Sequence, residues 1–125
     1  MSNALILFAH GARDARWSGP FEAVAEHIRS ARPNLPVRLA FLEFMSPTLP
    51  QAGAELVALG CERIDVLPMF LGAGGHVRKD LPLLMQVLSE QHPGTQFTLH
   101  AAVGEMASVV AAMALAALTR IDGQQ

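Results

Sequence analysis

The feature that most constrains the fold is a fourfold alternation of short apolar runs with longer segments of helical spacing. The first run, Ala4–Ala9, is apolar at every position, as expected for a strand that is buried on both faces. The connecting segments are long enough for crossover helices, which predicts a mainly parallel sheet. The predicted strands are Ala4–Ala9, Val37–Leu42, Ile64–Leu71 and Gln96–Ala101. We therefore expect one α/β domain over residues 1–125, with three αβα layers around a four-stranded sheet.

Four helices are predicted between and after these strands. They cover Phe21–Ala31, Pro47–Leu59, Lys79–Gln91 and Glu105–Thr119. Ser46 is the expected N-cap of the second helix, and Gly60 follows its end. The last helix is rich in alanine, which permits close backbone approach. We expect this helix to pack on its own sheet, and a subunit interface is the alternative.

Composition narrows the class of protein. The 125 residues are 51% apolar and 16% charged, which is unlike a disordered chain, and the formal net charge of −2 is unlike a general nucleic-acid binder. One cysteine excludes an internal disulfide framework and a cysteine-based zinc site. The longest late apolar tract, Met106 to Leu118, is shorter than a bilayer span, and the N-terminal run lacks the basic flank of a signal peptide. We expect a cytoplasmic protein without a membrane or nucleic-acid partner.

Three chemically capable side chains follow three different strands. His10 follows the first strand, Glu43 follows the second, and His76 lies beyond the third on a glycine-rich loop. Ligands of parallel sheets bind outside the carboxyl ends of the strands, so topology should gather these residues at one edge. Two imidazoles and a carboxylate are suited to holding a transition metal or to general acid–base catalysis. Ordinary loop hydrogen bonding is the alternative for each residue taken alone.

The surrounding loops are rich in glycine and in cations. The run Gly72 to Gly75 lacks the Lys-Ser/Thr of a phosphate-binding P-loop, and Gly74 and Gly75 instead permit close approach of a flat ligand. Four cations follow the first and third strands: Arg13, Arg16, Arg78 and Lys79. Such a group is suited to a ligand with several carboxylates, and solvated loop charge is the alternative.

The remaining notable side chains are predicted to be structural. His27 lies within the first helix and His92 within a turn, whereas His100 ends the fourth strand and is a weaker site candidate. Cys61 is expected to be a small buried residue or a helix-end residue. Two aromatic residues, Trp17 and Phe70, could belong to the core or could line a cleft for an aromatic ligand.

Three sequence blocks together resemble the short CbiX-type sirohydrochlorin chelatases. These blocks are His10–Asp14, Ala40–Glu43 and Leu67–Asp80, and they occur in the order of that family. The resemblance implies a class II chelatase fold in which this chain is one half and pairs with a second copy, whereas larger relatives carry both halves in one chain. It also implies metal-binding histidines at His10 and His76. Ala12 stands where the family usually has serine, so this chain lacks that hydroxyl.

The resemblance implies a metal chelatase of the lyase class that acts in cobalamin or siroheme-type biosynthesis. The expected reaction inserts a divalent metal into sirohydrochlorin or a related tetrapyrrole, with Co²⁺ as the metal substrate and Fe²⁺ or Ni²⁺ as alternatives, and without an organic cofactor. His10, Glu43 and His76 are the expected catalytic residues. The expected substrate-binding residues are Arg13, Gly74, Gly75 and Arg78.

Two other functions are compatible with the same residues. A tetrapyrrole or metal carrier would use the same ligands without turnover. A hydrolase or transferase could use His10 and Glu43 as acid and base, although the Gly-x-Ser-x-Gly nucleophile elbow is absent from the sequence. One half-sized domain provides only one wall of a tetrapyrrole cleft, and we therefore expect a homodimer.

Overall fold

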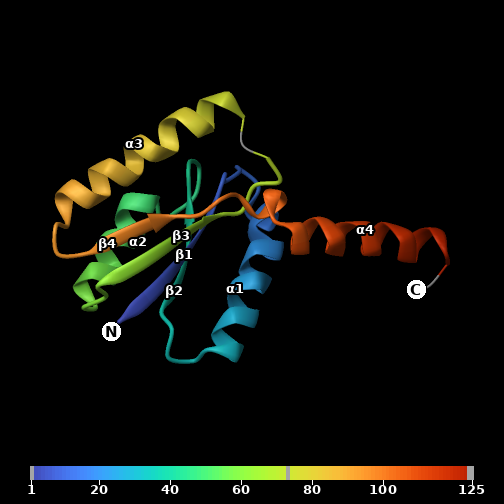
Figure 1. Cartoon of the computed structure of the whole chain (residues 1–125), viewed down its shortest axis with the longest axis horizontal. Helices are drawn as coiled ribbons and strands as arrows, with labels where there is room; N and C mark the ends of the chain where they lie inside the picture. The colour runs from blue at the N-terminus through green and yellow to red at the C-terminus, as the bar shows by residue number, and fades with distance from the viewer. Residues whose placement is uncertain (1, 73, 124–125) are drawn as a thin grey trace.

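The four strands form one parallel sheet. The computed structural model describes residues 2–72 and 74–123, apart from the side chain of His76. The strands are β1 (Asn3–Ala9), β2 (Val37–Phe41), β3 (Arg63–Pro68) and β4 (Gln96–Leu99). Their order is β2-β1-β3-β4, and each neighbouring pair is parallel. The predicted α/β fold is confirmed (Figure 1).

Helices cover both faces of this sheet. The helical elements are η1 (Ala15–Ser18), α1 (Gly19–Ala31), α2 (Leu49–Ala58), α3 (Gly75–Gln91), η2 (Val103–Glu105) and α4 (Ala107–Ile121). The helices α2 and α3 pack on one face, and α1 packs on the other. This arrangement gives the three layers that the alternating pattern predicted.

The central strand β1 carries the core of both layers. Ile6 and Phe8 face α2 and α3, where they meet Leu56 and Leu88, whereas Leu7 faces α1. All five side chains are fully buried. Burial of each such side chain stabilises the fold by about 1.5–3 kcal/mol. The strand ends that carry the candidate site therefore rest on a well-packed framework.

The start of α2 differs from the prediction. The N-cap is Thr48, not Ser46, and the helix begins at Leu49. The Thr48 hydroxyl accepts a bond from the Gln51 N–H at 3.3 Å, and the Gln51 side chain accepts one from the Thr48 N–H at 2.9 Å. This reciprocal pair satisfies two amide groups at the helix start, which Ser46 is too far upstream to do.

The third crossover also differs from the prediction. β3 ends at Pro68 instead of Leu71, β4 ends at Leu99 instead of Ala101, and α3 begins at Gly75 instead of Lys79. Val77 packs against the same core cluster as Leu81, one helical turn later. That contact extends the apolar stripe of α3 toward its N-terminus, and Gly74 becomes the N-cap.

The last helix does not pack on its own sheet, contrary to expectation. α4 follows η2 and projects away from the sheet beyond the carboxyl ends of the strands (Figure 1). None of its residues, all of which the structure describes, is buried. Sequence composition correctly indicated an apolar helix, but α4 buries none of its residues on the sheet of this chain.

Candidate metal and tetrapyrrole site

His10 and Glu43 meet at the carboxyl edge of the sheet. His10 directly follows β1 and Glu43 follows β2, and these strands are neighbours. The Nε2 atom of His10 lies 3.1 Å from Oε2 of Glu43, and each side chain is 48% exposed. Half-exposure leaves both groups reachable by a ligand from solvent. The predicted juxtaposition of this imidazole and this carboxylate is present in the structure.

The backbone of the two loops holds this pair together. Pairing continues past the strands, because the Glu43 N–H donates to the His10 carbonyl at 3.1 Å. Gly11 has a φ of +95°, and a Cβ atom at this position would overlap the carbonyl oxygen of Glu43. Glycine is therefore required at position 11 for both conformation and space. The approach of the two loops depends on this one residue.

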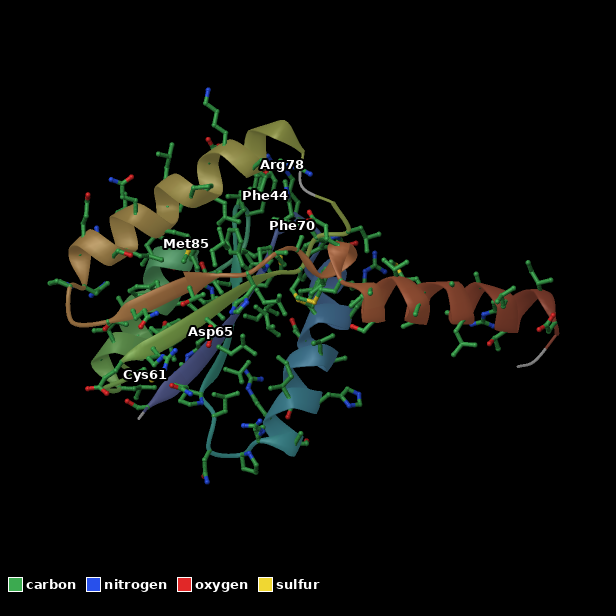
Figure 2. The ribbon with its side chains drawn as sticks, in the orientation of Figure 1. Phe44, Cys61, Asp65, Phe70, Arg78 and Met85 are labelled. Atoms are coloured by element: carbon green, nitrogen blue, oxygen red, sulfur yellow. The ribbon has the colours of Figure 1, made fainter. Side chains whose placement is uncertain are left out.

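Aromatic and apolar groups surround the imidazole. The Phe70 ring lies 6.4 Å from the His10 ring at an edge-on angle of 66°. Phe44 has a φ of +67° and is exposed, and the Arg13 guanidinium lies over its ring at 4.5 Å. Figure 2 shows Phe44, Phe70 and Arg78 at the same end of the molecule. Leu71 is also exposed. The His10–Glu43 pair is therefore next to apolar side chains, with the cations Arg13 and Arg78 farther out.

The N-terminus of α3 follows β3 and belongs to the same edge. Gly74 is its N-cap, and Gly75 is its first residue. A Cβ atom at either glycine would meet open space, so both leave this turn unobstructed. His76 is the second residue of the helix, but its side chain lies outside the described part of the structure. The pairing of His76 with His10 around a metal therefore remains a prediction.

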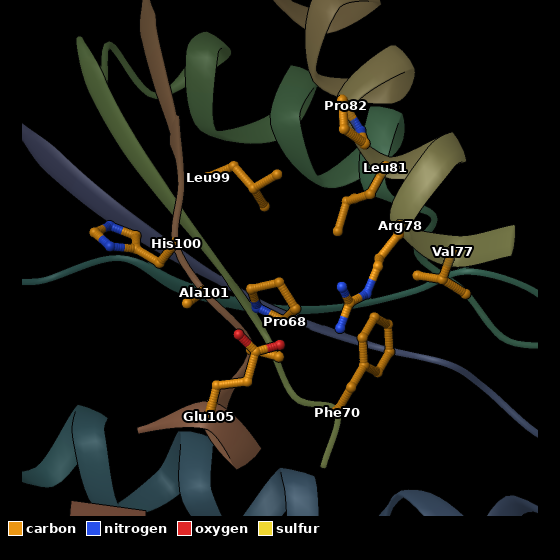
Figure 3. A pocket seen from close by; sticks show the side chains of 11 residues that line it. Pro68, Phe70, Val77, Arg78, Leu81, Pro82, Leu99, His100, Ala101 and Glu105 are labelled. Carbon is orange, nitrogen blue, oxygen red and sulfur yellow. The ribbon is translucent and has the colours of Figure 1, made fainter. Parts of the chain in front are cut away.

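A cavity of about 250 Å³ lies between the start of α3 and the ends of β3 and β4. Its walls include Pro68, Phe70, Val77, Leu81 and Leu99. Two further lining residues, Arg78 and Glu105, point into it from opposite sides (Figure 3). Phe70 thus separates the cavity from His10 and contacts both. The sequence left open whether Phe70 belongs to the core or lines a cleft, and the structure shows that it does both.

The four predicted cations have different surroundings. Arg16 is paired with Asp14 at 3.0 Å, on the outside of η1. The hydrogen bonds from the Arg16 side chain and backbone hold the pKa of the Asp14 carboxyl below its usual range. Arg13 lies on Phe44, Arg78 points into the cavity, and Lys79 is exposed on α3. Arg13 and Arg78 are therefore better placed for an anionic ligand than Arg16.

A second histidine–carboxylate pair was not predicted. Nε2 of His100 lies 2.8 Å from Oδ1 of Asp65, and both side chains are about half-exposed. Asp65 interrupts the apolar strand Arg63–Pro68 and faces the side of the sheet that carries α1. That interruption was the available signal, because a carboxylate within a strand needs a polar partner. His100 follows β4, the neighbouring strand.

The other histidines and the cysteine have no part in this site. His27 is exposed on α1, and the His92 ring lies 6.1 Å from Phe97 at the end of α3. Cys61 is buried, which is one of its two predicted placements. Among the described side chains, no group of three or more histidine, cysteine or acidic residues is arranged to hold a metal. Of the helices in the described ranges, none combines the length and apolar character needed to cross a bilayer.

Comparison with known proteins identifies close similarity to one family. The family model named CbiX matches residues 4–118. A sirohydrochlorin cobaltochelatase of Methanocaldococcus jannaschii is 33% identical over 89 residues, which are 71% of this chain and 62% of the relative. The chain thus spans less than two thirds of that relative's length.

Solved structures show the same fold. A CbiX protein of cobalamin biosynthesis from Marinobacter aquaeolei is 31% identical, with a TM-score of 0.85 over 96% of this chain and 98% of that one. SirB from Bacillus subtilis, solved with Fe³⁺, is 24% identical with a TM-score of 0.76. The match covers 92% of this chain but only 46% of SirB. This fold is therefore found both as a chain of similar length and as part of a longer one.

Proposed function

This chain belongs to the CbiX family, and we propose that it inserts a divalent metal into sirohydrochlorin or a related tetrapyrrole, with Co²⁺ as the preferred metal substrate. The observation that carries the proposal is the half-exposed His10–Glu43 pair at the carboxyl edge of the sheet. Curated relatives that are 30–35% identical bear the name sirohydrochlorin cobaltochelatase. Cobalt is preferred because of those names, since imidazole ligands also accept Fe²⁺ and Ni²⁺.

The reaction requires that a metal ion lose water and that two pyrrole N–H groups lose their protons. With Nε2 of His10 facing Glu43, the other ring nitrogen, Nδ1, is the one available to the incoming metal. A Nε2–H bond to Glu43 fixes that tautomer and increases the basicity of the ligand atom. Glu43 is also the carboxylate that accepts a pyrrole proton, which then passes to solvent. His76 is the proposed second histidine ligand.

The border of the site is suited to the rest of the substrate. An apolar macrocycle would rest against Phe44 and Phe70, and its peripheral carboxylates would meet Arg13 and Arg78. The open turn at Gly74 and Gly75 would allow close approach of the flat ring. We further propose that the chain acts as one chelatase half and that a second copy supplies the facing wall.

The test is metallation of sirohydrochlorin, followed by absorbance with Co²⁺, Fe²⁺ and Ni²⁺ in parallel. We expect catalysed insertion with multiple turnovers per chain, fastest with Co²⁺. Arg13→Ala and Arg78→Ala should raise KM for the tetrapyrrole. Arg63→Ala is the matched control, because Arg63 is exposed at the start of β3, the opposite end of the strand from the site. Stoichiometric binding without turnover would instead identify a carrier.

A further inference from the structure

The loop between β2 and α2 has a base that is fixed next to the candidate site. The Phe41 N–H donates to the Pro47 carbonyl at 2.9 Å, which closes the loop. The Glu43 N–H donates to the His10 carbonyl at 3.1 Å, which joins the loop to the one after β1. The next residue along the chain is Phe44. The position of Phe44 is therefore set relative to the His10–Glu43 pair.

Phe44 has a backbone conformation that is unfavourable for phenylalanine. Its φ of +67° lies in the left-handed region, and no other residue except glycine has a positive φ in the described ranges. This conformation brings the Cβ atom of a side chain too close to a carbonyl oxygen. Backbone strain of this kind occurs most often at binding and catalytic sites. The strain at Phe44 is therefore a reason to ask what its ring contacts.

Phe44 is also the aromatic side chain that a flat ligand can reach. It is 55% exposed, whereas Phe70, which labels the same end of the molecule in Figure 2, is 9% exposed. The other aromatic residues of the chain all lie in the described ranges and are buried or half-buried. Aromatic rings contact one another through faces and edges, so an exposed ring is suited to an apolar macrocycle.

Arg13 covers part of the Phe44 ring. The guanidinium carbon lies 4.5 Å from the ring centroid, which is a contact between a cation and the negative face of an aromatic ring. Arg13 follows β1 and Phe44 follows β2, so this contact joins the same two loops as the Glu43–His10 hydrogen bond. Arg13 is itself exposed, and the N–H edge of its guanidinium is accessible to an anion.

We propose, on the basis of the proposed function, that Phe44 and Arg13 recognise the tetrapyrrole together. The exposed part of the Phe44 ring packs on the macrocycle, and the same ring positions the Arg13 guanidinium for a carboxylate at the rim of that macrocycle. A contact between an exposed cation and a ring adds little stability and does not require left-handed backbone. Recognition of a ligand with an apolar face and an anionic rim accounts for both features.

Binding of metal-free sirohydrochlorin tests the role of the ring. The dissociation constant is measured by fluorescence titration without any metal. Phe44→Leu should weaken binding by about 10-fold or more, because it removes both the stacking and the support for Arg13. Phe44→Trp should restore binding to near the native value. Leu83→Ala is the matched control and should bind normally, because Leu83 on α3 is an apolar side chain with a similar exposure of 57%.

A pair of small substitutions separates the ring from the backbone. Phe44→Gly accepts the φ of +67° without strain, whereas Phe44→Ala keeps a Cβ atom there. The glycine variant should therefore unfold at a higher urea concentration than the alanine variant. Both should bind sirohydrochlorin as weakly as Phe44→Leu. Native binding in either variant would show that the ring does not contact the ligand, and would overturn the proposal.

A double-mutant cycle tests whether Phe44 positions Arg13. In the native background, Arg13→Ala should weaken binding. In the Phe44→Leu background, the same substitution should change the dissociation constant by less than about twofold, because Arg13 has already lost its support. Arg78→Ala is the control and should weaken binding by the same factor in both backgrounds, since Arg78 points into the cavity beside Phe70. Equal effects of Arg13→Ala in both backgrounds would overturn the positioning role.

The outcomes for this inference and for the proposed function can be told apart. A native chain that neither binds nor metallates sirohydrochlorin would contradict both. A native chain that inserts metal, together with unchanged binding in Phe44→Leu, would overturn only the shared role of Phe44 and Arg13.

Discussion

Two histidine–carboxylate pairs lie on this sheet, and taken alone they are nearly alike. His10–Glu43 and His100–Asp65 have contacts of 3.1 and 2.8 Å, and all four side chains are between 43% and 48% exposed. Even a charged pair at such exposure stabilises a fold by less than about 1 kcal/mol, so the contacts themselves do not distinguish the two pairs. The difference between them lies in what surrounds each one.

The first pair is built from loops, and the second is built from strands. His10 and Glu43 follow neighbouring strands, and a Cβ atom at Gly11 would overlap the Glu43 carbonyl oxygen where their loops meet. Asp65 lies within β3 in register with Thr98, on the face of the sheet that carries α1. The comparison teaches that a short contact does not identify a site. Placement at the open carboxyl edge of the sheet is the reason that we propose the metal chemistry for the first pair and not for the second.

The largest expected effect is the loss of the first imidazole. His10→Ala should lower the initial rate of cobalt insertion by about 100-fold or more, because a metal ligand or proton acceptor is removed. His100→Ala should keep a rate close to that of the native chain. The rates are measured by absorbance at saturating sirohydrochlorin, and circular dichroism confirms that both variants fold. Equal losses in the two variants would remove the distinction between the pairs.

Loss of the carboxylate should also slow insertion more in the first pair than in the second, by a smaller factor than loss of the imidazole. Glu43→Gln should slow insertion by about 10- to 100-fold, the usual effect of removing a group that orients a metal-binding histidine. Asp65→Asn should leave kcat unchanged. A pH–rate profile checks that Glu43→Gln acts through proton transfer, since its acid limb should move relative to the native profile. An unchanged acid limb would show that Glu43 has a structural role and does not transfer a proton.

Gly11 tests whether the first pair depends on its backbone. Gly60→Ala should lower the free energy of unfolding by about 1–2 kcal/mol, because Gly60 has a φ of +91° with open space around it. Gly11→Ala should cost more, since its Cβ must also displace the Glu43 carbonyl. Urea denaturation measures both. If the two variants lose the same stability, the close approach at Gly11 does not constrain the site.

The smallest expected effect concerns Asp14, a carboxylate near the first pair but outside it. Because Arg16 holds the pKa of Asp14 below its usual range, this contact favours the folded state above the pKa of the unfolded chain. The contribution disappears as pH falls through the lower pKa of the folded state. NMR titration of the Asp14 carboxyl should show a low midpoint that rises in Arg16→Ala. An unchanged midpoint would remove Arg16 as the cause.

The sheet and the first pair could be predicted because they follow from patterns of one chain. Continuous apolar runs mark strands that are buried on both faces, and residues after parallel strands meet at one edge. His10 and Glu43 were found in this way. Asp65 was missed because it lies within β3 and not after the end of a strand, and a single polar residue in a strand does not identify its partner.

The predictions that were wrong concern places where several residues carry similar local signals and packing or hydrogen bonding decides between them. Ser46 and Thr48 are both good N-caps, and the match of Thr48 with Gln51 decided between them. The glycines before His76 resemble a loop, but the packing of Val77 against the core makes α3 begin at Gly75. For α4, the prediction of packing on its own sheet was wrong, because an apolar composition does not specify the surface on which a helix packs.

The most direct test of the central claim is to locate cobalt on the protein. Crystals soaked in Co²⁺ and measured at the cobalt absorption edge give an anomalous difference map that shows metal positions independently of activity. We predict a peak within bonding distance of a His10 ring nitrogen, with Glu43 beside it. A peak at His100 and Asp65, with none at His10, would contradict the assignment of the metal site to the first pair.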